Sequence, residues 1–118
     1  MAKILMETDI AFEKVPWGLT KELIAPRTVG AQKVKVKITE YLPGHTHKNH
    51  VHPNQEEVIF VLSGKGMTQT REEKRQIGPG SVIFVGAGEP HTTWNLSDTE
   101  SLRTIVIKAP PEDEEVPI

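Results

Sequence analysis

The chain has 118 residues, a length that suits one domain able to bury a core without covalent cross-links. It has no cysteine, which excludes disulfides, thiolate metal ligands and a cysteine nucleophile. Fourteen basic and sixteen acidic residues give a net charge of -2, so nothing indicates a nucleic-acid or anionic-membrane partner. No apolar run is long enough for a signal peptide or for a membrane span of ~20 residues, and we expect a soluble, cytoplasmic protein.

The N-terminal part of the chain has the least regular pattern. Residues 17–24 (WGLTKELI) fit either a strand or one helical turn, and we expect a strand. We expect residues 1–29 to supply one or more N-terminal strands, with a partner subunit as one surface on which they can pack. A core barrel over about residues 30–109 follows, so that residues 1–118 form a single domain.

Short extended segments separated by turn residues make up the rest of the chain. Lysines at 33, 35 and 37 alternate with Val34, Val36 and Ile38, which predicts a strand with one wet face. Further strands are predicted over residues 57–62, 67–70, 81–85, 92–96 and 102–108, with a charged hairpin tip at 71–75. No segment repeats apolar residues with the helical period, so the chain is predicted to be an all-β sandwich or barrel. The acidic tail, residues 110–118, reads as a frayed end or as an arm that orders on a partner.

Three of these strands are apolar on both faces. In residues 58–62 (VIFVL) both alternating sets of side chains are apolar, and residues 81–85 and 105–107 behave alike. A strand covered on only one side should alternate polar and apolar residues. We therefore expect one face to lie in the barrel interior and the other under a packed segment or a second subunit, which predicts a homodimer.

Four of the five histidines lie within eight positions, followed closely by two glutamates: His45, His47, His50, His52, Glu56 and Glu57. On an extended chain, the spacing of His50 and His52 places both imidazoles on one face, where both can reach one ion. Residues 53–55 are turn material that could fold Glu57 back toward them, and His91 begins a later strand. Taken alone, the cluster also fits a loose metal-binding tract or a pH-sensitive surface.

The glycines around these histidines separate the alternatives. The spacing Gly44-(x)5-His50-x-His52-(x)4-Glu57-(x)6-Gly64 resembles the first motif of the cupin superfamily at every fixed position. The spacing Gly80-(x)5-Gly86-x-Gly88-(x)2-His91-(x)3-Asn95 resembles the second motif, except that Gly86 stands where the family usually has proline. Fifteen residues separate the two motifs, the short spacing of compact single-domain cupins.

This resemblance implies a single-domain cupin jelly-roll β-barrel of two antiparallel sheets with a metal ion inside one end. By motif position the ligands are His50, His52, Glu57 and His91, and Glu56 points to the opposite face of its strand. The implied cofactor is one divalent transition metal ion per subunit, Fe, Mn, Ni or Zn. A set of three histidines and one carboxylate leaves coordination positions open for water, substrate or dioxygen.

His45 and His47 occupy variable positions of the motif. They can be plain surface residues, they can line the pocket mouth as acid/base or substrate contacts, or one can join a metal site. The second interpretation makes them the candidate catalytic residues. Thr93 and Asn95 share strand parity with His91, so we expect both in the wall of the site, where a ligating imidazole needs a hydrogen-bond acceptor. Trp94 has the opposite parity and should pack outside.

Cupins include dioxygenases, decarboxylases, lyases, isomerases and non-catalytic binding domains, so the fold does not select an activity. The first hypothesis is a metal-dependent enzyme on a small oxygenated organic substrate, with a dioxygenase-like oxidoreductase favoured over a lyase or isomerase. The second is a module that binds a small, sugar-like ligand without turnover. The expected partners are a small molecule and a second copy of the chain.

Overall fold

A computed structural model describes residues 1–114 and 116–117, and for residues 46–49 and 117 it describes the backbone alone. Two short helical turns precede and interrupt the strands, η1 (Glu7–Asp9) and α1 (Pro26–Val29). The strands are β1 (Glu13–Val15), β2 (Gly18–Ile24), β3 (Lys35–Tyr41), β4 (Thr46–Val51), β5 (Glu56–Ser63), β6 (Gly66–Gln69), β7 (Lys74–Ile77), β8 (Val82–Val85), β9 (His91–Asn95), β10 (Leu102–Ala109) and β11 (Val116–Pro117). No helix among the described residues is long and apolar enough to cross a membrane.

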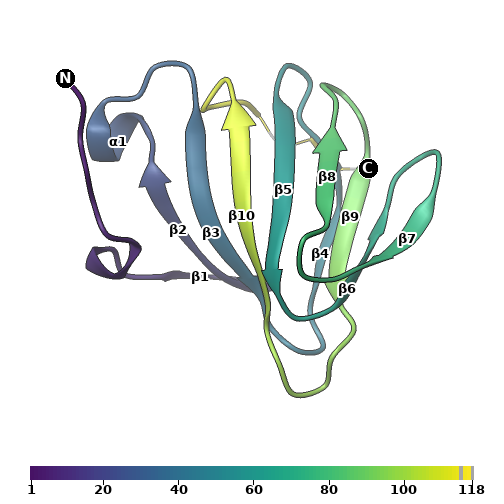
Figure 1. Cartoon of the computed structure of the whole chain (residues 1–118). Helices are drawn as coiled ribbons and strands as arrows, with labels where there is room; N and C mark the ends of the chain where they lie inside the picture. Colours follow the sequence, from purple (N-terminus) through teal and green to yellow (C-terminus); the bar gives the residue numbers. More distant parts are fainter. Residues whose placement is uncertain (115, 118) are drawn as a thin grey trace.

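The strands form two antiparallel sheets, as predicted (Figure 1). One sheet has the order β1-β2-β3-β10-β5-β8, and the other has the order β11-β4-β9-β6-β7. Of residues 17–24, Trp17 lies in a turn and the rest form a strand as expected, because β2 pairs with β3 from Gly18 onward. The hairpin tip is shorter than predicted, because Lys74 already pairs with Gln69 across β6 and β7. The fold is therefore the predicted all-β, two-sheet architecture.

The apolar core lies at one end of the space between the sheets. Tyr41, Val61, Ile77 and Leu102 are buried there, and Leu102 and Val61 are fully inaccessible. The ring of Trp17 stacks on Tyr41 with centroids 4.9 Å apart. These side chains fill the interior at this end of the barrel.

Strand β3 corrects one sequence prediction. Its lysine face was expected to be wet, but Lys37 shares its face with Thr39 and Tyr41, which are 1% and 4% exposed. The ladders place Lys37 beside Val106 of β10, and Val106 beside Ile59 of β5, both buried. The lysine face of this strand therefore turns into the barrel.

The N-terminal segment covers part of the outer face of the larger sheet. The Nζ atom of Lys21 lies 2.9 Å from a carboxylate oxygen of Glu7 and donates to the Glu7 carbonyl at 2.6 Å. Arg103 donates to both carboxylate oxygens of Glu7 at 2.8 Å. Lys21 and Arg103 hold the pKa of Glu7 below its usual range. Glu7 thus fastens η1 onto strands β2 and β10 of its own chain.

The acidic tail was expected to be a frayed end or an arm for a partner, but it packs on its own chain. Strand β11 pairs with β4, with Val116 opposite Val51. The backbone N–H of Asn54 donates to Asp113 at 2.7 Å, and the Gln55 side chain donates to the carbonyl of Pro110 at 2.8 Å. The tail therefore closes over the turn that joins β4 and β5.

Candidate metal centre

Three of the predicted ligands come together from three strands on two sheets. His50 near the end of β4 is directly opposite His91, the first residue of β9. Glu57 is the second residue of β5 in the other sheet, and its odd parity turns it inward while Glu56 is exposed. Each of the three residues offers a ligand atom, and these atoms all lie within 4.8 Å of one another. Such a separation lets one ion contact all three after small adjustments.

The three side chains are buried, with His50 3%, His91 4% and Glu57 7% exposed. The Nε2 atom of His91 lies 3.3 Å from Oε2 of Glu57, and the rings of His50 and His91 have centroids 4.6 Å apart. Burial alone would raise the pKa of Glu57, but its contact with His91 and the charge of Lys108 lower it to about 2. The carboxylate is therefore ionised at neutral pH, the state in which it can bind a cation.

His52, the fourth predicted ligand, lies next to this group but not within it. Its ring centroid is 5.0 Å from that of His50, and its Nδ1 atom is 3.1 Å from the carbonyl oxygen of Glu114. A carbonyl only accepts, so Nδ1 carries the proton and the lone pair lies on Nε2. Among the described residues this buried Nε2 has no hydrogen-bond partner. Burial and the nearby charge of Lys108 lower the pKa of His52, which keeps the ring neutral.

The buried donors fit a metal ion. Imidazole nitrogens and a carboxylate oxygen, without sulfur, suit the first-row transition metals from Mn to Zn. The buried Nε2 of His52 would otherwise be a polar atom without a partner, which is costly in a protein interior. The cluster and the fold together indicate a metal ion, and the place of His52 in its coordination stays a prediction.

The contact between the tail and His52 predicts a measurable effect of the tail on metal binding. We expect a chain that ends at Pro110 to bind Zn²⁺ about 10–100-fold more weakly, the usual effect of removing an outer partner of a ligating histidine. Competition with a chromophoric chelator measures this. Asp113→Ala, which removes the contact with Asn54 but keeps the Glu114 carbonyl, is the control and should have the smaller effect. Equal affinity in the shortened and full chains would contradict this role.

The other two histidines of the cluster lie in or just before β4. His45 is exposed, in the turn that precedes this strand, and its backbone N–H donates to the carbonyl of Leu42 at 3.2 Å. The backbone of His47 pairs with Thr93, and its side chain lies outside the described residues. A catalytic role for His45 or His47 stays a prediction.

Thr93 and Asn95 are buried on the same side of β9 as His91, as their parity predicts. Their described hydrogen bonds do not reach the histidines, however. The Thr93 hydroxyl lies 2.9 Å from that of Thr68, and Asn95 donates to the carbonyls of Tyr41 and Glu100 at 2.8 and 2.7 Å. Both residues therefore fix the barrel wall, while the Lys74 ammonium over the ring of Trp94 is consistent with the outward position predicted for Trp94.

Sequence reasoning missed a group of lysines next to the ligands. Lys108 of β10 lies directly opposite Glu57 on one side and Lys35 of β3 on the other. Lys37 lies on the same face, two positions along from Lys35. The available signal was that Thr39 and Tyr41 share strand parity with the lysines. A face exposed to water would not bury a threonine and a tyrosine, and both of these residues are buried.

The loop before His91 departs from the family pattern at Gly86. The backbone N–H of Gly86 donates to Oε1 of Glu89 at 2.9 Å, a bond that proline could not make. A Cβ atom at this position would lie 2.7 Å from the same oxygen. The hydrogen bond to Glu89 therefore restrains the loop at Gly86, where a proline ring would restrain the backbone covalently.

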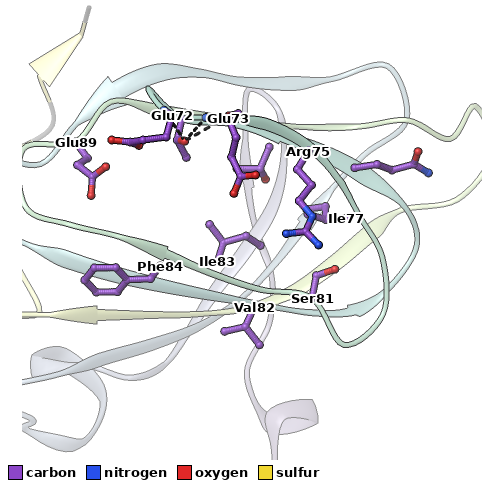
Figure 2. Close-up of a pocket in the computed structure, with 12 residues that line it drawn as sticks. Glu72, Glu73, Arg75, Ile77, Ser81, Val82, Ile83, Phe84 and Glu89 are labelled. Atoms are coloured by element: carbon purple, nitrogen blue, oxygen red, sulfur yellow. Dashed lines mark hydrogen bonds between the residues drawn. The ribbon is translucent and has the colours of Figure 1, made fainter.

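One cavity, of about 520 Å³, is lined by residues of β6, β7 and β8 and by none of the described histidines. It opens between the free edges of β7 and β8, where the two sheets separate. Figure 2 shows Glu73 and Arg75 on one side of it and Ile83 on the other. Thr68 reaches it and contacts Thr93, which connects this opening to the interior wall beside His91.

Known proteins resemble this chain in sequence and in structure. It is 41% identical over 58 residues to an uncharacterized protein of Streptomyces coelicolor, covering 49% of this chain and 53% of that protein. It is 27% identical over 94 residues to the tetracenomycin polyketide synthase protein TcmJ of Streptomyces glaucescens, covering 80% of this chain and 62% of TcmJ. The matches thus span between about half and two thirds of those relatives.

Two solved structures superpose closely. The polyketide cyclase RemF of Streptomyces resistomycificus matches with a TM-score of 0.84 and 25% identity, over 100% of this chain and 86% of RemF. A predicted oxalate decarboxylase of Thermotoga maritima matches with a TM-score of 0.80 and 18% identity, over 91% and 98% of the two chains. The family model of the cupin domain matches residues 37–108, more than half of the sequence and all four predicted ligands. This chain belongs to the cupin family.

Proposed function

We propose that this cupin is a metal-dependent enzyme that acts on a small oxygenated organic substrate, with lyase, isomerase or cyclase chemistry at a carbonyl group. The observation that carries the proposal is the buried group of His50, Glu57 and His91, whose ligand atoms converge within 4.8 Å inside the barrel. When bound, a divalent transition metal ion supplies Lewis acidity toward a substrate oxygen. The likeness to a polyketide cyclase and to a predicted decarboxylase supports this choice.

The chain's own side chains give this site a hydrogen-bonding wall and an apolar wall. Burial and the nearby carboxylate of Glu57 raise the pKa of Tyr41, so its hydroxyl stays neutral and can donate a hydrogen bond. Tyr41 contacts Thr93, which in turn contacts Thr68. Ile59 and Val61, 1% and 0% exposed, follow Glu57 on the inner face of β5 and exclude water from that side. A carbonyl substrate bound at the three donors would thus lie beside the apolar inner face of β5.

Turnover under argon tests the proposal. The full chain is loaded separately with Fe²⁺, Mn²⁺, Ni²⁺ and Zn²⁺ and incubated with hydroxy-ketones, β-diketones and β-keto acids, and products are measured by mass spectrometry. We expect a product that depends on the metal, forms without oxygen and disappears in His91→Ala. Tight binding without any product would instead favour the ligand-binding module and overturn the enzyme proposal.

A dioxygenase is the second candidate. The donor set, rich in histidine and free of sulfur, also suits Fe²⁺ and Mn²⁺, the metals of oxygen-using sites. The same assay separates the two activities. Product that forms only in air, with matching oxygen consumption, would select the dioxygenase.

We also propose that the chain is a homodimer. The outward side of β10, β5 and β8 is a continuous apolar surface, here called the apolar sheet face, consisting of Val58, Phe60, Leu62, Val82, Phe84, Ile105 and Ile107. Val82 and Phe84 are 62% and 58% exposed. The face begins where the cover by the N-terminal segment ends, and two such faces can pack at ~10 Å as sheets do in sandwiches. A second copy offers the same apolar surface and so suits this face.

The apolar sheet face predicts the oligomeric state. We expect a dimer by light scattering at about 10 µM and a monomer for Phe84→Glu, because a buried unpaired carboxylate opposes association. Leu96→Glu, at an exposed apolar residue after β9, is the matched control and should stay dimeric. A monomeric wild-type chain would refute the dimer.

A further inference from the structure

Three lysines lie in the barrel interior beside Glu57, and two of them form no ion pair with a described carboxylate. Lys35, Lys37 and Lys108 all lie on the inner face of β3 and β10. Lys35 is paired, with its Nζ atom 2.9 Å from Glu22 and 3.2 Å from Glu112. Among the described side chains, neither Lys37 nor Lys108 lies within ion-pair distance of a carboxylate. Glu22 lies opposite Lys37 in the ladder and Glu57 lies opposite Lys108, and both carboxylates act on the charge of Lys37 without pairing with it.

The strand register fixes where these two ammonium groups lie. Lys108 is directly opposite Glu57, and Cβ atoms of opposite residues lie roughly 4.5–5.5 Å apart. Lys37 is beside Val106, which is two residues before Lys108 on the same inner face. The charge of Glu57 acts on Lys37, and that of Lys108 acts on Glu57, so both ammonium groups lie near this carboxylate. The Lys108 charge already acts on Glu57 and His52, whose pKa values it lowers.

Two partly buried lysines that lie close together destabilise the folded chain unless an anion neutralises their charge. Both side chains are at least partly buried, and burial and the Lys108 charge lower the pKa of Lys37 to about 8. Glu57 is close enough to offset part of this charge, but a bound cation would draw on the same carboxylate. A small carboxylate would neutralise both lysines and accept charge-assisted hydrogen bonds from them.

We propose that Lys37 and Lys108 form a binding subsite for a carboxylate group of the substrate, inside the barrel and next to the metal ligands. The proposal rests on the proposed function and narrows it to anionic substrates, such as keto acids or dicarboxylates. One end of the substrate would lie against the lysines of β3 and β10, and its carbonyl end would face His50, Glu57 and His91. The lysines are positioning residues that select charge and orientation.

Malonate, with its neutral analogue malonamide, tests the subsite by calorimetry on the full chain, both as purified and after metal removal. We expect malonate to bind in both states and malonamide to bind far more weakly. Lys37→Met and Lys108→Met should each weaken malonate binding at least about tenfold, the loss of one charge-assisted contact. Lys33→Met, at an exposed lysine just before β3, should bind as the wild type does, and Lys108→Arg should keep most of the affinity.

The outcome of the malonate-binding experiment is independent of the outcome of the turnover experiment. Wild-type affinity in both methionine variants, equal binding of malonamide, or no malonate binding at all would overturn the subsite while leaving metal-dependent turnover of a neutral substrate intact. Lysine-dependent malonate binding in a chain that turns over no substrate would overturn the enzyme and keep the subsite. Circular dichroism confirms that each variant is folded before binding is measured.

Discussion

Replacing His50 or His91 by alanine abolishes stoichiometric metal binding, as we expect from their place in the site. Each supplies one of three buried donors within 4.8 Å, so loss of either leaves at most two of the three in contact with an ion. The affinity should fall by more than about 100-fold, beyond the effect of losing an outer contact. Elemental analysis after dialysis against a fixed free-metal concentration measures the remaining content.

His45→Ala is the matched control for these two changes. It removes an imidazole from the same histidine cluster, but His45 is exposed and precedes the ligand strand. Its metal content should equal that of the wild type. Full metal content in both His50→Ala and His91→Ala would refute the ligand assignment. His52→Ala then tests the fourth position, where an intermediate loss would indicate a role beside the ion and a full loss would indicate a ligand.

The convergence of His50, Glu57 and His91 could be predicted because the positions of these residues depend on short-range rules. Alternation along an extended chain separates Glu57 from Glu56, and the glycine spacing fixes the turns between strands. Gly44, Gly80 and Gly88 have φ values of 78°, 88° and 76°, a backbone region that residues with a Cβ atom rarely adopt. Both constraints depend on residues that are close together in the sequence, so the fold and the convergence of the three donors could be predicted from it.

The lysine face could not be predicted in the same way. A strand in which lysine and valine alternate has two possible orientations, and the hydrophobic pattern favours the one with lysine outside. The observed orientation depends on the other face of β3, where Ile38 is 4% exposed and lies opposite Lys21, which the N-terminal segment covers. This cover acts between distant parts of the chain.

The packing of the acidic tail could not be predicted from the sequence for a related reason. Its acidic, proline-bounded composition is typical of a mobile end. Its order comes from single contacts, such as Asp113 with the backbone of Asn54 and the carbonyl of Pro110 with Gln55. Backbone carbonyls carry no sequence signal, so the Glu114 carbonyl that orients His52 is visible only in three dimensions.

Lys37→Met should raise the thermal stability of the metal-free chain at pH 7. Burial lowers the pKa of Lys37 from its usual 10.5 to about 8, and Lys108 contributes to this shift. A shift of this size corresponds to on the order of 3 kcal/mol of destabilisation by the charged form. Methionine has a similar volume and no charge, so we expect about 1–3 kcal/mol more stability and a Tm several degrees higher. Differential scanning calorimetry measures both.

The pH dependence of this gain identifies its cause. Because the folded pKa lies below the unfolded one, the unfolded chain binds more protons between about pH 8 and 10.5, and wild-type stability from this group rises over that range. The advantage of Lys37→Met should therefore shrink between pH 8 and 10, while Lys33→Met should change Tm little at any pH. The same variant should lose malonate binding, so that stability and ligand affinity move in opposite directions. A lower Tm for Lys37→Met at pH 7 would mean that the ammonium group is already stabilised within the barrel, and would contradict a lysine that lacks a counter-ion.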